Sequence, residues 1–381
     1  MSDNHEDDAI NHLLGEYDER QSLSEMERKV KTHRLKSQVR SIENQEANMA
    51  KLSQLDIRGV SDTQIEQMNK EHEMMRESLK SSIPFICPTL TSFFNFSYPS
   101  LVFIGAKSGQ GKSTFTANLA YSLLVDKRKS GEKRKILILS NEEMSLSVYN
   151  RLGCLHLGYN LNDVKNFTDE QHENLKKFRT GVAKAGRVRV IDPSYDGVEG
   201  ATTSYEGLVA ILDNLLKKHK EKVAQNPDAE ADFDAIIIDY YQKINESKET
   251  SEPTWAVLKK VSDYLDNYYK QYPAPVVVFG QIKPESKDDD VDSFEYRIKD
   301  GKSIFIPATI ALELKPVKEE SRTEVILQKA RWSSEQGKSV NVGWDKGLIV
   351  DYTDEFKLKK AQEREERAHK NMMAGVKPKN D

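Results

Sequence analysis

The chain has 381 residues, of which 37% are hydrophobic and 31% are charged, and its formal net charge is −4. This composition supports one large core with additional solvated helices, and it excludes a broadly basic coat for nucleic acid, although not a local basic groove. Two widely separated cysteines, Cys87 and Cys154, argue against a disulfide scaffold or a zinc site and favour two buried thiols in a reducing compartment. The N-terminus is acidic and no apolar run approaches membrane-spanning length, so we expect a cytoplasmic protein without membrane contact.

Residues 1–82 are polar and charged and show no strand pattern. Within them, Ser61 and Gln64 form a capping box that predicts the start of a helix, which we place at 61–82. An apolar stripe then follows at alternating spacings of three and four: Ile65, Met68, His72, Met75 and Leu79. This stripe must be buried, either on the chain's own globular domain or on a neighbouring subunit.

Residues 83–352 alternate short apolar runs with helical patterns, for example at 114–124 and 208–223. The runs lack polar alternation, as expected for strands covered on both faces: 101–104, 136–139, 188–191, 235–238 and 275–279. Alternating strands and helices predict an α/β domain with a mostly parallel sheet. Four closely spaced runs follow (309–314, 323–329, 339–344 and 348–352) and predict antiparallel strands at one edge. The charged residues 353–381 predict a helix that fades into a disordered end.

The segment "AKSGQGKS" (106–113) fits the P-loop template, with alanine in place of the first glycine. Gly109 and Gly111 permit a tight turn whose N–H groups suit phosphate oxygens. Lys112 reaches the β- and γ-phosphates, and Ser113 offers its hydroxyl to Mg²⁺. Because the turn follows an apolar strand and opens a helix, we predict a site for ATP, or another nucleoside triphosphate, with Mg²⁺. It comprises Ala106, Lys107, Ser108, Gly109, Gln110, Gly111, Lys112, Ser113 and Thr114.

Acidic and amide side chains follow other predicted strands, at the edge where open α/β sheets bind ligands. Asp239 ends the run "AIIID" and is predicted to hold Mg²⁺ together with Ser113. Glu142 and Glu143 follow the second strand, where one of them could polarise water, although acids are also common at helix N-termini. Gln281 ends the segment "VVVFGQ", just after the strand at 275–279, and is either a sensor of the γ-phosphate or a surface glutamine.

Two cations lie near the end of the run "TEVILQKARW". Lys329 and Arg331 are two residues apart on a strand, so both side chains project to the same face. Such pairs commonly protect a sheet edge. Alternatively, an arginine at this position could neutralise transition-state charge in a neighbouring subunit.

In their order, these motifs resemble the DnaB-type replicative helicases, which are hexameric ATPases with a RecA-like core. The segments that carry the resemblance are "GKSTFTANLA", "LSNEEMSLSVYNRLGC", "FDAIIIDYYQKI", "VVVFGQ" and "QKAR". The resemblance covers about 83–352 and implies that Glu143 is the catalytic glutamate, with Glu142 as the runner-up. It also implies that Lys329 and Arg331 contact the nucleotide of the adjacent subunit, and that the helix at 61–82 is a linker by which each subunit grips the next.

The chain departs from the family pattern at several places. Tyr241 replaces a leucine, and Gly280 stands where serine is usual. The N-terminal region is too short for the usual primase-binding domain, so a primase or a helicase loader is only an optional partner. "KDGKSI" falls where the family's DNA-binding loop lies, which places Lys299, Gly301 and Lys302 at the DNA backbone. An acidic run, "DDDVD", lies just upstream, so a solvated loop remains the alternative.

We therefore predict a ring-forming, hexameric, ATP-driven DNA helicase that translocates on single-stranded DNA. Two alternatives remain open. One is a RecA-like recombinase that forms filaments, and the other is an ATPase that acts without DNA to remodel or load a protein partner.

Overall fold

The chain divides into two compact units, residues 1–71 and 72–381, and each is described by itself. In this computed structural model the described residues are 60–66, 68–69, 72–73, 85–94, 100–128, 130–193, 201–226, 229–245, 252–284, 293–331 and 336–373.

In the first unit, the predicted capping box at the start of a helix is confirmed. The Gln64 N–H donates to Ser61 Oγ at 3.2 Å, and the Ser61 N–H donates to Gln64 Oε1 at 2.9 Å. On this helix the apolar side chains of Ile65 and Met68 are exposed. Two further positions of the predicted stripe, Met75 and Leu79, lie outside the described residues.

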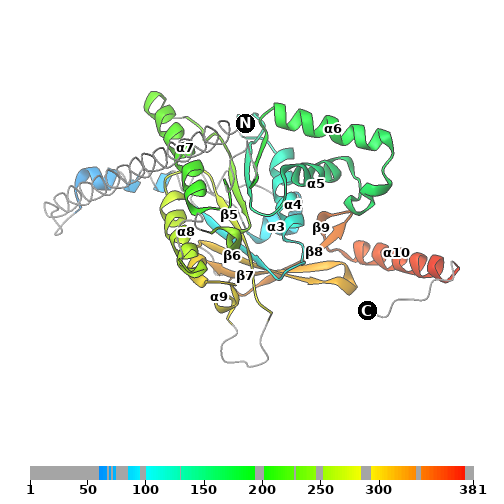
Figure 1. The fold of residues 1–381 in the computed structure, drawn as a ribbon. Helices are drawn as coiled ribbons and strands as arrows, with labels where there is room; N and C mark the ends of the chain where they lie inside the picture. The colour runs from blue at the N-terminus through cyan, green and yellow to red at the C-terminus, as the bar shows by residue number, and fades with distance from the viewer. Residues whose placement is uncertain are drawn as a thin grey trace, which may run out of the picture. The chain divides into compact units, whose positions relative to one another are not determined.

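Among the described residues of the second unit, nine strands form a single sheet in the order β3-β2-β4-β5-β1-β6-β7-β8-β9 (Figure 1). The strands are β1 Leu101–Ala106, β2 Ile136–Ser140, β3 Val188–Ile191, β4 Ala235–Asp239, β5 Val276–Gln281, β6 Ile310–Val317, β7 Arg322–Ala330, β8 Ser339–Asp345 and β9 Leu348–Asp351. The first five pair in parallel, as predicted. Of the four strands predicted as antiparallel, β7, β8 and β9 are so. β6 differs, because it runs parallel to β1 and antiparallel only to β7.

Helices cover both faces of the parallel part of the sheet (Figure 1). On one face lie α4 (Lys112–Val125), α5 (Ser145–Leu157) and α6 (Asp169–Lys184). On the other face lie α7 (Tyr205–Gln225) and α8 (Thr254–Tyr268). Short helices complete the order: α3 Pro88–Phe93, η1 Leu161–Asn166, η3 Tyr241–Lys243, α9 Phe294–Arg297, η5 Lys302–Phe305 and η6 Lys318–Glu320.

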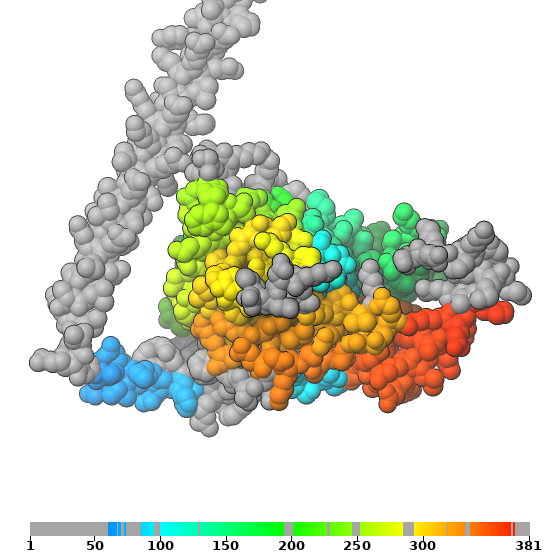
Figure 2. All heavy atoms as spheres, turned by 90° about the horizontal axis from the view of Figure 1, so that it is seen from below, coloured from blue at the N-terminus to red at the C-terminus, as the bar shows by residue number. Residues whose placement is uncertain are grey.

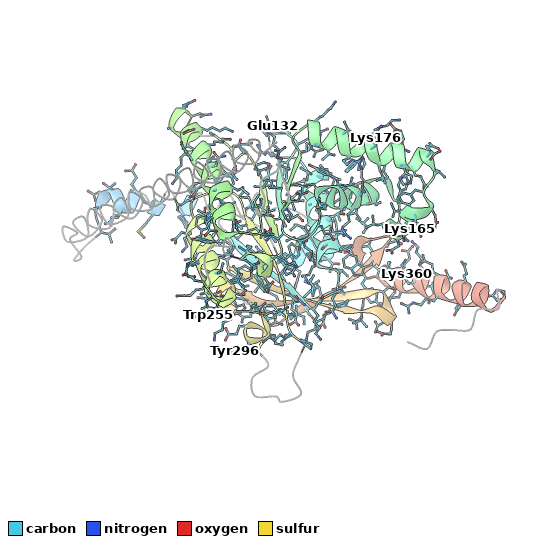
Figure 3. The ribbon with its side chains drawn as sticks, in the orientation of Figure 1. Glu132, Lys165, Lys176, Trp255, Tyr296 and Lys360 are labelled. Carbon is cyan, nitrogen blue, oxygen red and sulfur yellow. The ribbon has the colours of Figure 1, made fainter. Side chains whose placement is uncertain are left out.

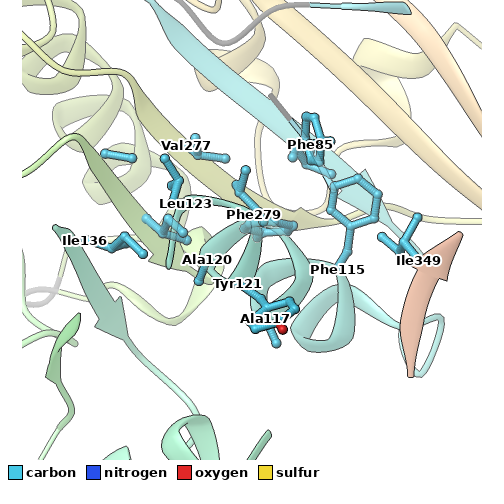
Figure 4. Close-up of a cluster of buried hydrophobic side chains, with 14 of the residues drawn as sticks. Phe85, Phe115, Ala117, Ala120, Tyr121, Leu123, Ile136, Val277, Phe279 and Ile349 are labelled. Atoms are coloured by element: carbon cyan, nitrogen blue, oxygen red, sulfur yellow. The ribbon is translucent and has the colours of Figure 1, made fainter. Parts of the chain in front are cut away.

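The two-sided cover explains why the strand runs are continuously apolar. Along β1, Val102 and Ile104 face the cluster around α4, while Leu101 and Phe103 face the cluster around α8. Figure 4 shows the first of these clusters, in which Phe115 of α4 lies near Phe279 of β5 and Ile349 of β9. α4 is itself almost wholly buried, and this burial fixes the start of the helix against the sheet.

The C-terminal helix α10 (Asp354–Met373) confirms the helix predicted after residue 353, and the end predicted to be disordered lies outside the described residues. α10 lies beside the antiparallel strands, as Figure 2 shows in red and orange, and Lys359 donates to Asp345 of β8 at 2.9 Å. Cys87 and Cys154 are buried free thiols, as predicted. None of the described helices is long and apolar enough to cross a membrane.

Candidate nucleotide and nucleic-acid site

The turn between β1 and α4 has the backbone of a phosphate cradle. Gly109 and Gly111 have φ values of 70° and 85°, in the left-handed region that glycine tolerates best. Gly111 is the N-cap of α4, so the N–H groups of the first helical turn face the loop without intrahelical partners. Together with the helix dipole, these N–H groups form a site for an anion.

Lys112 begins α4 and is only partly exposed. Its Nζ lies 3.5 Å from the Lys107 carbonyl oxygen and 5.5 Å from the centre of the Tyr240 ring. Burial lowers the pKa of Lys112, and the charges of Asp239 and Glu142 oppose this shift. Among the described side chains, no carboxylate lies within ion-pair distance of this ammonium. A cation that is half-buried and weakly paired suits an anionic ligand such as a triphosphate.

Asp239 ends β4 next to the first turns of α4. Its Oδ2 accepts a hydrogen bond from Thr116 Oγ1 at 3.0 Å, one helical turn after Ser113. Burial, together with the nearby charge of Glu143, raises the pKa of Asp239 to about 6, against the opposing effects of the Thr116 hydroxyl and Lys112. A carboxylate that is costly to ionise and lies next to a hydroxyl-bearing helix is a suitable ligand for a divalent cation held with phosphate oxygens. The residues present therefore fit Mg²⁺ and ATP.

Glu143 lies at the same edge of the sheet, because β2 and β4 pair in parallel with Ser140 opposite Asp239. Its Oε1 accepts from Arg151 Nη2 of α5 at 2.6 Å, and its backbone N–H donates to Ser140 Oγ at 3.2 Å. The neighbouring Glu142 is more exposed. Arg151 thus fixes the direction of the Glu143 carboxylate.

The Gln242 side chain connects this edge to the segment after β5. Its Oε1 accepts from the Gln281 N–H at 2.9 Å. Its Nε2 donates to the carbonyl oxygens of Gln281 at 3.0 Å and Lys299 at 3.1 Å. Since Gln242 is almost buried and lies three residues after Asp239, one side chain joins the ends of β4 and β5 to the 299–302 segment.

A buried cluster of hydroxyl groups contacts Ser303, the residue that follows the same segment. The Tyr241 hydroxyl lies 2.6 Å from the Leu258 carbonyl oxygen, 2.8 Å from Ser262 Oγ and 3.0 Å from Ser303 Oγ. These bonds hold η5 against α8. They also give a reason for the departure at position 241, because a leucine would leave the two serine hydroxyls without this partner.

The departure at position 280 also has a structural reason. A Cβ placed on Gly280 would lie 2.4 Å from Cε2 of Phe103 on the neighbouring strand. In this chain the phenyl ring therefore fills the space that a serine side chain would need.

The side chains of Lys329 and Arg331 lie on the same side and reach the backbone of residues 305–306, as their spacing predicted. Lys329 Nζ donates to the carbonyl oxygens of Phe305 at 2.6 Å and Ile306 at 2.8 Å, and Arg331 Nη2 donates to that of Ile306 at 3.0 Å. Burial and the charge of Arg331 lower the pKa of Lys329. Both residues lie at the edge of the sheet opposite to the P-loop, because β7 runs antiparallel and Arg331 N–H bonds Thr309 at the amino end of β6.

The structure thus places Lys112, Asp239, Glu143 and Gln281 at one edge of the sheet, and it separates them from Lys329 and Arg331. Sequence analysis missed three residues that organise this edge: Thr116, Arg151 and Gln242. All three lie inside the segments that carry the family resemblance, and that was the available signal, but sequence analysis gave none of them a role.

A mostly parallel sheet with a P-loop after β1 and acids after β2 and at the end of β4, all at the same edge, defines a RecA-like nucleotide-binding core. The sequence model of the DnaB-like helicase C-terminal domain matches residues 89–293, more than half of the chain. The chain therefore belongs to the DnaB-like helicase C-terminal domain family, and the predicted resemblance and fold class are confirmed.

One solved structure with a TM-score above 0.5 shares this fold, and two others are similar to the chain with lower scores. A DnaB-like replicative helicase, described with its interactions with primase, is 15% identical with a TM-score of 0.53, over 77% of this chain and 67% of its own. An ATPase domain is 16% identical with a TM-score of 0.49, over 67% of this chain and 85% of its own. The RadB recombinase is 14% identical with a TM-score of 0.43, over 71% of this chain and 100% of its own. No protein with curated annotation matches the chain.

Proposed function

We propose that the protein is an ATP-driven, ring-forming DNA helicase that translocates on single-stranded DNA and unwinds duplex. The observation that carries this proposal is the Gln242 bridge, because it connects the edge proposed to hold the triphosphate to the segment proposed to contact DNA. The proposal also rests on membership of a helicase family. A primase or a helicase loader remains a partner that only the family resemblance predicts.

In the proposed nucleotide site, the backbone of 106–114 cradles the phosphates and Lys112 meets their β- and γ-oxygens. Ser113 and Asp239 would hold Mg²⁺, which neutralises phosphate charge when bound. Glu143 orients the attacking water and accepts its proton, and Arg151 keeps the Glu143 carboxylate in place. This division of roles is a proposal for each of these residues.

The proposed ring follows from the separation of the two parts of the site. β1 separates Arg331, which lies near its start, from the P-loop at its end, and six extended residues span roughly 17–20 Å. Arg331 and Lys329 are therefore assigned to the nucleotide of the adjacent subunit. The exposed Ile65 and Met68 support a linker helix that docks on a neighbouring copy.

The proposed DNA contacts are Lys299, Gly301 and Lys302. Lys299 and Lys302 are exposed, and the backbone of Lys299 is fixed by Gln242 and by its own N–H bond to the Gln281 carbonyl at 2.9 Å. A change at the Gln281 edge during hydrolysis would thus move this segment directly. Contacts of this kind bind the DNA backbone without regard to sequence.

The test measures unwinding of a forked duplex and stimulation of ATP hydrolysis by single-stranded DNA. The wild-type protein should show both, and Lys112→Ala should abolish both while the fold, checked by circular dichroism, stays intact. Filaments on DNA in electron micrographs would favour the recombinase alternative. Hydrolysis that ignores DNA, together with no unwinding, would favour an ATPase that remodels a protein partner.

A further inference from the structure

Two aromatic side chains are exposed at the same place on the surface. Among the described residues, Trp255 and Tyr296 are the only aromatic ones in the set of large, strongly exposed apolar side chains, with exposed fractions of 61% and 51%. Trp255 begins α8 and Tyr296 lies on α9, and Figure 3 shows both at the same end of the molecule. Large aromatic rings grouped on a surface usually mark a binding site.

Both rings line one hollow of about 570 Å³, a volume within the range of small-ligand sites. Lys302 contributes its ammonium to this hollow, 4.1 Å from the centre of the Tyr296 ring. The charges along the wall balance in number, because Lys283 and Lys302 are positive and Glu295 and Asp300 are negative. Because the hollow has flat rings and little net charge, it is better suited to a ligand that stacks on the rings than to a ligand that is held by charge alone.

We infer that this hollow holds a base of the single-stranded DNA, stacked on the indole of Trp255, with Lys302 at an adjoining phosphate. The inference rests on the proposed function, because the hollow includes Gly301 and Lys302 of the segment proposed to contact DNA. Every base has a π-face, so such a contact is indifferent to sequence and suits a translocating protein. Because the wall carries no net positive charge, the base supplies a large share of the affinity.

The test compares two fluorescent oligonucleotides of equal length, oligo(dT) and an abasic strand that keeps all the phosphates. Affinities are measured by anisotropy with full-length protein and a non-hydrolysable ATP analogue. Wild type should prefer oligo(dT). Trp255→Ala should weaken oligo(dT) binding by at least about fivefold, the lower limit for one stacked base, and leave the abasic strand unchanged. Trp255→Phe should retain most of the preference.

The matched control is Leu358→Ala, which removes an equally exposed apolar side chain from α10. It should change neither affinity. If Trp255→Ala binds both strands as wild type does, or weakens both equally, the stacking assignment is wrong.

A second hollow, lined by Trp255, Ile306 and Arg331, continues along α8. If Trp255→Ala disrupts rings in mass photometry without changing the preference for oligo(dT), the indole belongs to a contact between copies, and the inference is overturned. Wild-type protein that binds neither strand would overturn both this inference and the helicase proposal. If the wild-type protein unwinds duplex and Trp255→Ala keeps the wild-type preference for oligo(dT), only the stacking contact is disproved and the helicase proposal stands.

Discussion

Asp239 combines a raised pKa with a proposed role as a Mg²⁺ ligand. Burial at the end of β4 favours the protonated form, whereas the proposed role as a Mg²⁺ ligand requires the ionised form. The hydrogen bond from Thr116 Oγ1 offsets part of this conflict, because it stabilises the carboxylate. Binding of the metal and release of a proton are therefore expected to be coupled near neutral pH.

We expect the affinity for Mg²⁺-nucleotide to fall as the pH decreases through about 6, the pKa of Asp239. The ionised fraction changes by about fourfold between pH 7.5 and pH 5.5, and the affinity should follow it. Thr116→Val removes a bond that lowers the pKa, so its midpoint should lie at a higher pH than that of wild type. Titration of nucleotide binding at fixed Mg²⁺ measures both midpoints. Because the nucleotide's own titration is common to both proteins, equal midpoints would contradict the assignment.

The same shift also affects stability, with the opposite trend. Because the folded pKa of Asp239 is raised above 3.8, its contribution to the stability of the nucleotide-free protein is greatest below pH 3.8 and is lost as the pH rises through about 6. We expect Mg²⁺-nucleotide binding to compensate for this loss above pH 6, where the ionised side chain would gain a cation.

At this scale the sequence predicts the residues whose pattern is local and misses those defined by distant contacts. The P-loop is predicted from eight consecutive residues, and Asp239 is predicted from the apolar strand that it ends. The contact between Thr116 and Asp239 instead spans 123 positions, and the one between Gln242 and Gln281 spans 39. No periodicity encodes such pairs, because only the packing of α4 and β5 beside β4 brings them together.

At the scale of elements, the segment after β5 is attached to the sheet by a buried ion pair. Arg297 of α9 donates from both terminal nitrogens to Glu313 of β6 at 2.7 Å, and Glu313 has no exposed surface. Gln328 Nε2 donates a further bond to the same carboxylate at 2.6 Å. The carbonyl oxygen of Arg297 also accepts from the Lys283 N–H, so the two ends of the 283–297 segment are held together.

We expect Arg297→Met to destabilise the fold by about 3–5 kcal/mol, because it leaves the charged, buried Glu313 without its bidentate partner and with only Lys315, whose Nζ lies 3.9 Å from Glu313 Oε1. The double variant Arg297→Met/Glu313→Met should recover most of this loss, since it removes both charges. Arg322→Met, which breaks an exposed pair with Glu320, should cost less than about 1 kcal/mol and serves as the control. Urea unfolding measures all three. A single variant as stable as the control would show that the buried pair does not anchor the segment.

The elements themselves were largely predictable, and the exception is instructive. Unbroken apolar runs predicted β1 to β5 because both faces of those strands meet helices. The runs at 309–314 and 323–329 are too close together for a helix, and this spacing suggested that both strands are antiparallel. β6 instead pairs in parallel with β1, because the long crossover from β5 through α9 and η5 returns the chain to the amino edge before β6 begins.

At the scale of the whole molecule, the proposed role of Arg331 at a neighbouring subunit's nucleotide means that one chain would hold only parts of two sites. The P-loop lies at the carboxyl edge of the parallel strands, and Arg331 lies at the amino edge. The proposed ring would close this arrangement, because each copy would then present one edge to one neighbour and the opposite edge to the other.

Mixing two inactive variants tests this arrangement. Lys112→Ala has no working phosphate site but keeps its arginine, and Arg331→Ala keeps its phosphate site but lacks the arginine. Each alone should be nearly inactive in ATP hydrolysis, while binding of nucleotide to Arg331→Ala should persist. In an equal, random mixture, half of the phosphate sites and half of the arginines are intact, so about a quarter of the interfaces should be complete and hydrolysis should recover toward that fraction. Mixing Lys112→Ala with the double variant Lys112→Ala/Arg331→Ala should restore nothing. If Arg331 acted on its own chain's nucleotide, the first mixture would remain as inactive as its components, because no chain in it would hold both groups.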